Sequence, residues 1–361
     1  MEIVRSERRE SSSLNQEQAE SNGCDPEIHS RALVLPTPDN LKNELFLSPR
    51  LARQIREHRE QINRIVTGED KRLIVIVGPC SLHCDASALE FAQRLQVLQA
   101  GCIDSCLLVM RAYLEKPRTS IGWKGMLYDP KMTGASDMRE GIVQSRQLLL
   151  QLAEVGLPLA TEALSPLAFN YIDDLISWVA IGARTTESQI HREMASALPC
   201  AVGFKNGTDG TFDSAINALK SASHPHDFLG ANSDGQLSMI CSSGNPYGQL
   251  VLRGGNGASN FDEFSVAKAV SALNNSGRQA SIIVDCSHEN SGKDHRNQNL
   301  ALRAVKQQID RGESALRGVM LESHLLAGKQ SIGGELEYGI SVTDACIGWE
   351  ETEMLIRFIA E

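Results

Sequence analysis

Residues Leu73-Ile74-Val75-Ile76-Val77-Gly78-Pro79-Cys80-Ser81 form a short apolar run that ends in a Gly-Pro turn and a polar tail. Five branched apolar residues in succession fit a strand that is buried on both faces, as the strands of a parallel sheet are. Barrel enzymes built from such strands carry their functional side chains at the carboxyl ends. Cys80 and Ser81 therefore mark the first candidate functional position.

The same pattern recurs along the rest of the chain. The eight predicted strands are 73–77, 107–110, 157–161, 178–182, 200–204, 250–252, 282–284 and 319–321. The predicted helices lie near 86–99, 139–155, 167–177, 187–197, 211–221, 262–274, 297–311 and 349–360. Strand and helix alternating eight times is typical of one α/β architecture, the (β/α)8 TIM barrel. A doubly wound open sheet is the structural alternative, but no Gly-x-Gly-x-x-Gly sequence follows any of the strands.

Two segments fall outside this alternation. Residues 1–45 are polar and rich in Ser, Gln and Glu, and they predict an N-terminal arm ahead of a catalytic barrel domain at 46–361. The Ser48-Pro49 pair at the start of that domain predicts the beginning of a helix. The segment 224–249 is rich in Gly, Ser and Asn, and we interpret it as an insertion before the sixth strand.

Composition and charge exclude several classes of function. The chain of 361 residues has a formal net charge of -10, which disfavours nucleic acid or an anionic membrane as a partner. No stretch approaches the roughly 18 apolar residues that a bilayer span requires, and the N-terminus lacks the apolar core of a signal peptide. Nine cysteines without paired spacing argue against a secreted disulfide framework. We therefore expect a cytoplasmic protein.

Ionisable side chains follow every predicted strand. The carboxyl ends of barrel strands meet at one mouth, so we expect these groups to face a shared site. The cations that follow predicted strands in this way are Arg111, Lys116, Arg118, Arg184, Lys205 and Arg253. Any one of them could be a solvated surface charge. Together, in a chain of net negative charge, they predict a polyanionic ligand such as a phosphate ester that also carries a carboxylate.

A second group at the same mouth has the residue types of a metal site. It consists of Cys80, His288, Glu322 and Asp344, the last in the loop after the eighth strand. A thiol, an imidazole and two carboxylates suit Mn, Fe, Co or Zn better than Ca or Mg. The alternatives are a buried, inert Cys80 and a His288 that only caps the following helix. No compact ligand motif decides between these interpretations.

Longer strings around these positions resemble a known family, the class I 3-deoxy-D-arabino-heptulosonate 7-phosphate (DAHP) synthases. The strings are Gly78-Pro79-Cys80-Ser81, Lys116-Pro117-Arg118-Thr119, Gly122-Trp123-Lys124-Gly125, Gly182-Ala183-Arg184-Thr185, Gly203-Phe204-Lys205-Asn206, Leu252-Arg253-Gly254-Gly255, Asp285-Cys286-Ser287-His288, Glu322-Ser323-His324 and Thr343-Asp344-Ala345-Cys346. They run in family order. The resemblance implies a metal-dependent transferase that opens the shikimate pathway of aromatic amino-acid biosynthesis, condensing phosphoenolpyruvate with D-erythrose 4-phosphate and water to DAHP and phosphate.

The resemblance also implies a role for each residue. One divalent metal ion would be held by Cys80, His288, Glu322 and Asp344. Phosphoenolpyruvate would be bound by Arg111, Lys116, Arg184, Lys205, Arg253 and the Ala183 N–H, and the sugar phosphate by Arg118 and Thr119. Lys116, Glu162 and Lys205 are the expected catalytic residues, with Lys116 protonating the new alkoxide and Glu162 activating the water. The family pattern further implies a homodimer or homotetramer.

Two alternatives remain from the sequence. A synthase of the same mechanistic group could use another aldose, such as arabinose 5-phosphate, although the 116–119 string and the long insertion favour the tetrose. The second alternative is not an enzyme: it is a regulatory protein that keeps the barrel but has no catalytic activity. Such a barrel is expected to have lost candidate metal ligands, whereas this chain retains all four.

Overall fold

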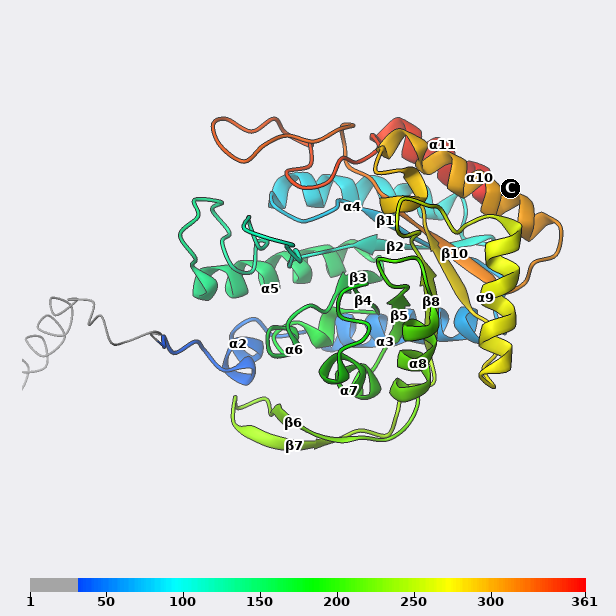
Figure 1. The fold of residues 1–361 in the computed structure, drawn as a ribbon. Coiled ribbons are helices and arrows are strands. Elements are labelled where there is room, and N and C mark those ends of the chain that lie inside the picture. The colour runs from blue at the N-terminus through cyan, green and yellow to red at the C-terminus, as the bar shows by residue number, and fades with distance from the viewer. Residues whose placement is uncertain (1–31) are drawn as a thin grey trace, which may run out of the picture. The chain divides into compact units, whose positions relative to one another are not determined.

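The computed structural model describes residues 32–361. Contacts divide the chain into a unit Met1–Leu35 and a compact unit Pro36–Glu361, which carries the fold (Figure 1). Most of the predicted arm, residues 1–31, lies outside the described residues. The boundary expected between residues 45 and 46 stays a prediction.

The strands of the compact unit close into a parallel barrel. Its strands are β1 (Leu73–Gly78), β2 (Cys106–Arg111), β3 (Leu159–Glu162), β4 (Trp178–Ile181), β5 (Ala201–Lys205), β8 (Gly248–Leu252), β9 (Ile282–Asp285) and β10 (Leu316–Glu322). Within the described residues these eight are joined in the order β1-β10-β9-β8-β5-β4-β3-β2. Closure places Ile74 of β1 opposite Leu107 on one side and Gly318 on the other. All eight predicted strands are present, which confirms the predicted (β/α)8 barrel.

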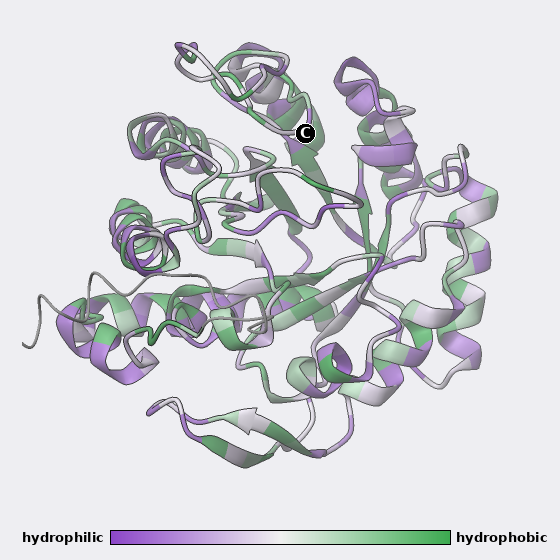
Figure 2. Cartoon of the chain, turned by 60° about the vertical axis from the view of Figure 1, so that its left-hand side comes forward, coloured by the Kyte–Doolittle hydropathy of each residue, from purple (hydrophilic) through white to green (hydrophobic). Residues whose placement is uncertain are grey.

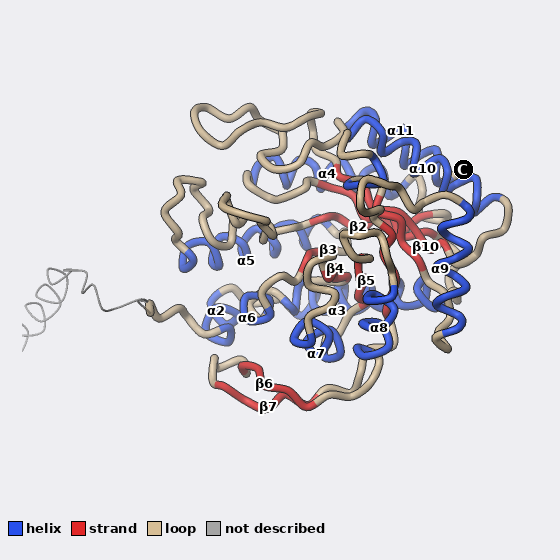
Figure 3. Tube along the Cα trace, viewed as in Figure 1, coloured by secondary structure: helices blue, strands red, loops and turns tan. Residues whose placement is uncertain are grey.

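Helices surround the barrel (Figure 3). They are α2 (Pro38–Glu44), α3 (Pro49–Thr67), α4 (Asp85–Ala100), α5 (Met138–Val155), α7 (Gln189–Ala197), α8 (Asp213–Ala222), α9 (Glu263–Asn275), α10 (Gln298–Asp310) and α11 (Trp349–Ala360). They show hydrophilic residues along their outer sides, while the strands between them are mainly hydrophobic (Figure 2). This is the patterning expected when a helix buries one stripe against a sheet.

One predicted helix is wrong in extent. Residues 167–177 form the short α6 (Pro166–Phe169) and a 3-10 turn η1 (Asp173–Leu175) rather than one continuous helix. The buried guanidinium of Arg146 on α5 explains the break, because it donates to the Tyr171 carbonyl at 2.9 Å and to the Asp174 carboxylate at 2.7 and 2.8 Å. A charge-assisted tertiary contact of this kind outweighs the weak helix propensity of the segment.

Side chains fill the barrel interior. Trp178 is fully buried there and donates its indole N–H to Gln249 Oε1 at 3.0 Å. Gly203 on the neighbouring strand makes room for that ring, since an added Cβ would lie 2.3 Å from it. Helix α3, whose predicted start at Ser48-Pro49 is confirmed, contributes Ile62 and Ile65 to the same buried cluster.

The predicted insertion before the sixth barrel strand is an antiparallel hairpin, β6 (Asp227–Ala231) paired with β7 (Leu237–Cys241). The Asn232 side chain shapes its turn by accepting from the N–H groups of Asp234 and Gln236. Asp39 of α2 donates its N–H to the Ser233 carbonyl at the tip, at 2.9 Å. Across residues 32–361, every helix is too short or too polar to cross a membrane.

Candidate active site

A cavity of about 770 Å³ opens at the carboxyl ends of the barrel strands. Its wall includes Glu162, Lys205 and Glu322, which end β3, β5 and β10. Of the residues selected from the sequence, those in the wall are Lys116, Arg118, Glu162, Ala183, Arg184, Lys205, Arg253, His288, Glu322 and Asp344. The strand ends therefore converge on one site.

Positive charge dominates the wall of this cavity. Among the described residues its cations are Lys116, Arg118, Lys124, Arg184, Lys205, Arg253, Lys293 and Lys329. The carboxylates are Glu162, Glu322 and Asp344. Eight cations against three carboxylates, in a chain of net charge -10, make this cavity a local anion site. The strand-end pattern does not predict Lys124, Lys293 and Lys329, because they stand on βα loops further from the strand ends. A count of every cation on those loops would include them.

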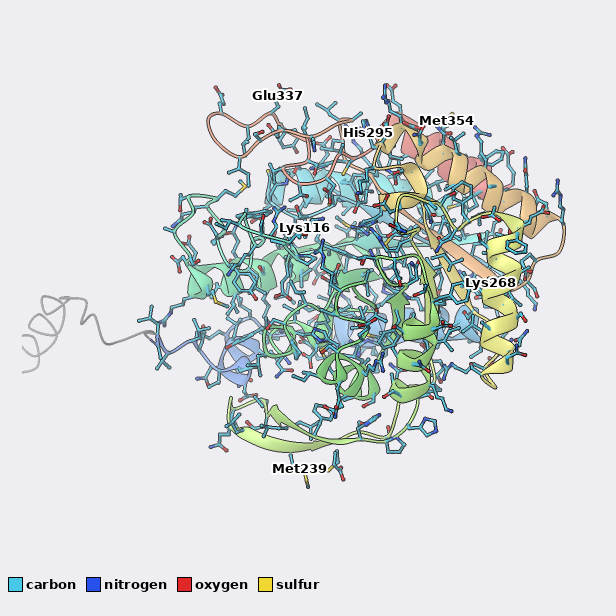
Figure 4. The ribbon with its side chains drawn as sticks, in the orientation of Figure 1. Lys116, Met239, Lys268, His295, Glu337 and Met354 are labelled. Atoms are coloured by element: carbon cyan, nitrogen blue, oxygen red, sulfur yellow. The ribbon has the colours of Figure 1, made fainter. Side chains whose placement is uncertain are left out.

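A compact thiol–carboxylate cluster lies at one side of the cavity. Ligand atoms of Cys80, Glu322 and Asp344 all lie within 4.8 Å of one another. The Lys116 ammonium donates to Cys80 Sγ at 2.6 Å and to Asp344 Oδ2 at 2.9 Å. Figure 4 labels Lys116 near the middle of the view and Met239 on the hairpin at the lower edge. The ammonium shared between a thiol and a carboxylate shows that this cluster attracts positive charge.

The charges around Cys80, Glu322 and Asp344 explain why this cluster attracts a cation. Burial, with the nearby Glu322 charge, raises the pKa of the Cys80 thiol to about 12. Burial alone would also raise the pKa of Asp344, but the Lys116 charge and the hydrogen bonds from Lys116 and Cys80 hold it well below its ordinary value. A thiol and two carboxylates around one point form a donor set that fits a borderline transition-metal ion.

His288 faces the same cavity without being part of the compact cluster. Its Nδ1 lies 3.0 Å from Asp285 Oδ2, and that oxygen also accepts from Lys205 Nζ at 3.0 Å. Burial alone would raise the pKa of Asp285, but the charges of Lys205 and His288 hold it well below its ordinary value. The structure thus brings together three of the four proposed ligands and places the imidazole on an adjacent carboxylate.

Three predicted site residues lie outside the cavity wall. Cys80 is fully buried beneath it. Arg111, only 1% exposed, lies behind Glu322, donating to Oε1 at 3.1 Å and stacking over the Tyr113 ring at 4.0 Å. Thr119 is exposed and absent from the wall. The position of a residue at the end of a strand does not predict how deeply its side chain is buried, because burial depends on how the loops cover the barrel.

The Glu162 carboxylate packs closely against Gly182 and lies near a second carboxyl group, that of Glu115. A Cβ added at Gly182 would lie 2.4 Å from Glu162 Oε1, so the carboxylate rests where only glycine leaves space. Behind it, buried Glu115 accepts from the Tyr128 hydroxyl at 3.0 Å and the Ser165 N–H at 3.2 Å. Burial raises the pKa of Glu115 to about 7.

Comparison with known proteins agrees with this geometry. The model of the DAHP synthetase I family matches residues 52–357. The chain is 49% identical over 329 residues to a phospho-2-dehydro-3-deoxyheptonate aldolase, Tyr-sensitive, of Escherichia coli (strain K12), covering 90% of this chain and 92% of the relative. It is 46% identical over 333 residues to a Trp-sensitive one of the same strain, covering 92% and 95%. The structure of such an aldolase from Francisella tularensis SCHU S4 superimposes with a TM-score of 0.90 at 40% identity, covering 92% and 97%.

Proposed function

This chain belongs to the DAHP synthetase I family, and from that premise we propose that it condenses phosphoenolpyruvate with D-erythrose 4-phosphate and water to DAHP and inorganic phosphate. The observation that carries the proposal is one cavity that combines eight cations with a thiol–carboxylate cluster. Both substrates are anions that repel each other. A site that neutralises both holds them close enough to react, which can lower a barrier by several kcal/mol, roughly 7–11 in favourable cases.

We assign the cations by their depth in the cavity. Lys205 and Arg253, both buried, would bind the carboxylate and phosphate of phosphoenolpyruvate together with Arg184 and the Ala183 N–H. Arg118, exposed at the entrance and anchored by its Nε on the Trp123 carbonyl at 2.6 Å, would bind the sugar phosphate. Arg111 would contribute positive charge through its ion pair with Glu322. Thr119, which lies outside the cavity wall, would contact the sugar phosphate from there.

The residues fit a divalent metal ion, one of Mn, Fe, Co or Zn. Cys80, Glu322 and Asp344 would hold it together with His288, and the three donor atoms already gathered within 4.8 Å support this assignment. Such an ion supplies Lewis acidity that polarises an aldehyde oxygen.

Two side chains are suited to the proton transfers. The Lys116 ammonium, which lies 2.6 Å from Cys80 Sγ and 2.9 Å from Asp344 Oδ2, would be the donor for the new alkoxide. Glu162, held against Gly182, would orient and deprotonate the water that adds to carbon 2. Loss of phosphate from the resulting hemiketal breaks the C–O bond and gives the ketone.

The metal part of the proposal is tested by chelation and reconstitution. Metal-stripped enzyme should lose turnover and regain it with Mn²⁺. Cys80→Ser should weaken Mn²⁺ binding. The control is Cys84→Ser, because the Cys84 thiol is half-exposed at the start of α4, and this substitution should leave Mn²⁺ binding unchanged. Full turnover of metal-free enzyme would show that the cluster has another purpose.

The assembly and location of the enzyme remain proposals. The hairpin β6–β7 leaves Leu229, Leu237 and Met239 more than two-thirds exposed, and grouped apolar residues of this size often mark a protein contact. This supports the predicted homodimer or homotetramer, which light scattering would test. A cytoplasmic location also stays a prediction.

A further inference from the structure

Asp285 is a buried carboxylate that the proposed mechanism does not use. It ends β9 and has no solvent exposure. Its Oδ2 accepts from Lys205 Nζ at 3.0 Å and lies 3.0 Å from His288 Nδ1. Its Oδ1 accepts from the Ser287 hydroxyl at 2.7 Å and from the Ser287 N–H at 3.1 Å. One side chain therefore joins two groups to which different ligands are assigned.

The Lys205 ammonium depends on this contact. Its side chain is 5% exposed, and within residues 32–361 Asp285 is its only hydrogen-bond partner. A buried ammonium is stable only when it is paired. The carboxylate therefore fixes where the ammonium points when an anion enters the cavity.

The His288 ring depends on the same carboxylate. The residue has a left-handed φ of 57° and its side chain is 25% exposed. The hydrogen bond at Nδ1 is with the Ser287 hydroxyl, 2.8 Å away, and Asp285 Oδ2 lies 3.0 Å from the same nitrogen. Because the Ser287 hydroxyl gives its one proton to Asp285 Oδ1, it accepts at His288 Nδ1. The hydrogen is then on Nδ1 and the lone pair on Nε2, the form in which an imidazole binds a metal.

We propose that Asp285 is a positioning residue that orients Lys205 toward phosphoenolpyruvate and His288 toward the metal ion at the same time. The proposal rests on the function proposed above. It implies that one substitution weakens two binding events that are otherwise separate. Removing a carboxylate that supports a metal-bound histidine typically costs about 10–100-fold in metal affinity.

The test measures binding rather than turnover. Calorimetric titration of the full chain with Mn²⁺ alone gives the metal affinity, and titration with phosphoenolpyruvate in the presence of chelator gives the substrate affinity. Asp285→Asn should weaken Mn²⁺ binding about 10–100-fold. It should weaken phosphoenolpyruvate binding about 10-fold or more, the effect of losing one hydrogen bond to a charged group. The matched control is Asp174→Asn, which also removes a carboxylate from a buried cation, Arg146, but outside the cavity; both affinities should be unchanged.

Double variants separate positioning from general damage. In a Lys205→Met background, Asp285→Asn should still weaken Mn²⁺ binding but cause no further loss of phosphoenolpyruvate affinity. In a His288→Gln background the reverse should hold. Losses that add independently in both backgrounds, or an Asp285→Asn protein with both wild-type affinities, would overturn the proposal.

Ser287→Ala keeps the test decisive if Asp285→Asn does not fold. It removes one donor to Asp285 Oδ1 and also the direct contact with His288 Nδ1, so phosphoenolpyruvate affinity is the decisive measurement. That affinity should fall by a smaller factor, about 3-fold, and no change in it would count against the proposal. Wild-type protein that binds neither Mn²⁺ nor phosphoenolpyruvate would instead refute the proposed function, on which this inference depends.

Discussion

The position of the Glu162 side chain depends on one close contact with Gly182. Its carboxylate is nearly buried, lines the cavity, and rests where a side chain at position 182 would collide with it. Residue types at strand ends could be recognised from sequence, because parallel strands bring their carboxyl ends together. The depth of each group could not, since it arises from tertiary packing: Arg111 lies behind Glu322, and Lys116 reaches Cys80.

The role proposed for Glu162 predicts an effect on kcat rather than on KM. Glu162→Gln should lower kcat about 100-fold with little change in the KM for phosphoenolpyruvate, because it removes water activation but little binding. Gly182→Ala should also lower kcat, since its Cβ would lie 2.4 Å from Glu162 Oε1. In the double variant the two losses should not add. Steady-state kinetics measures all three; a Glu162→Gln enzyme with near wild-type kcat would mean that another group handles the water.

Glu115 predicts a pH-dependent contribution to stability. Burial raises its pKa to about 7 from an ordinary value of 4.5, so the folded chain keeps a proton that the unfolded chain releases between these values. Stability should therefore fall as pH rises from 4.5 to 7, by up to the order of 1 kcal/mol per pH unit from this group. Glu115→Gln cannot ionise and should lack this contribution.

Urea unfolding of wild type and Glu115→Gln at pH 5, 6, 7 and 8 measures the difference. The unfolding free energy of the wild type should decline relative to the variant up to about pH 7 and then level. Parallel curves over the whole range would show that the Glu115 carboxyl ionises in the folded chain as readily as in the unfolded one.

At the scale of elements, the barrel strands were predictable and the connecting segments were less so. Strands buried on both faces are short apolar runs, so β1 could be read directly from Leu73–Val77. The hairpin β6–β7 is largely exposed, and its Gly, Ser and Asn content indicated only an insertion. The break between α6 and η1 depends on Arg146, which is distant in sequence.

Barrel closure predicts a site that cannot accept a side chain. A Cβ at Gly318 of β10 would lie 1.9 Å from the Ile74 carbonyl oxygen on β1, which is backbone that cannot move aside without breaking strand pairing. Gly318→Ala should lose roughly 3 kcal/mol of unfolding free energy or more. The control Gly101→Ala, where the nearest atom would be 3.5 Å away, should change it by less than about 1 kcal/mol. Urea unfolding compares them, and equal stability of the two variants would contradict this account of closure.

For the whole molecule, the distribution of charge links the fold to the proposed reaction. An acidic chain concentrates eight cations around one barrel cavity, which favours small polyanions rather than a nucleic-acid surface. The family strings predicted the family from sequence alone, and the family match over residues 52–357 confirms it. The preference for the tetrose, which the 116–119 string and the long insertion favour, stays a prediction.

The most direct measurement is the initial rate of phosphoenolpyruvate consumption by the Mn²⁺-loaded enzyme with D-erythrose 4-phosphate or arabinose 5-phosphate, with the product identified by mass. Phosphoenolpyruvate should disappear with the tetrose, releasing one inorganic phosphate for each DAHP formed, and should persist with the pentose or with no sugar. No reaction with the tetrose, or faster reaction with arabinose 5-phosphate, would contradict the assignment.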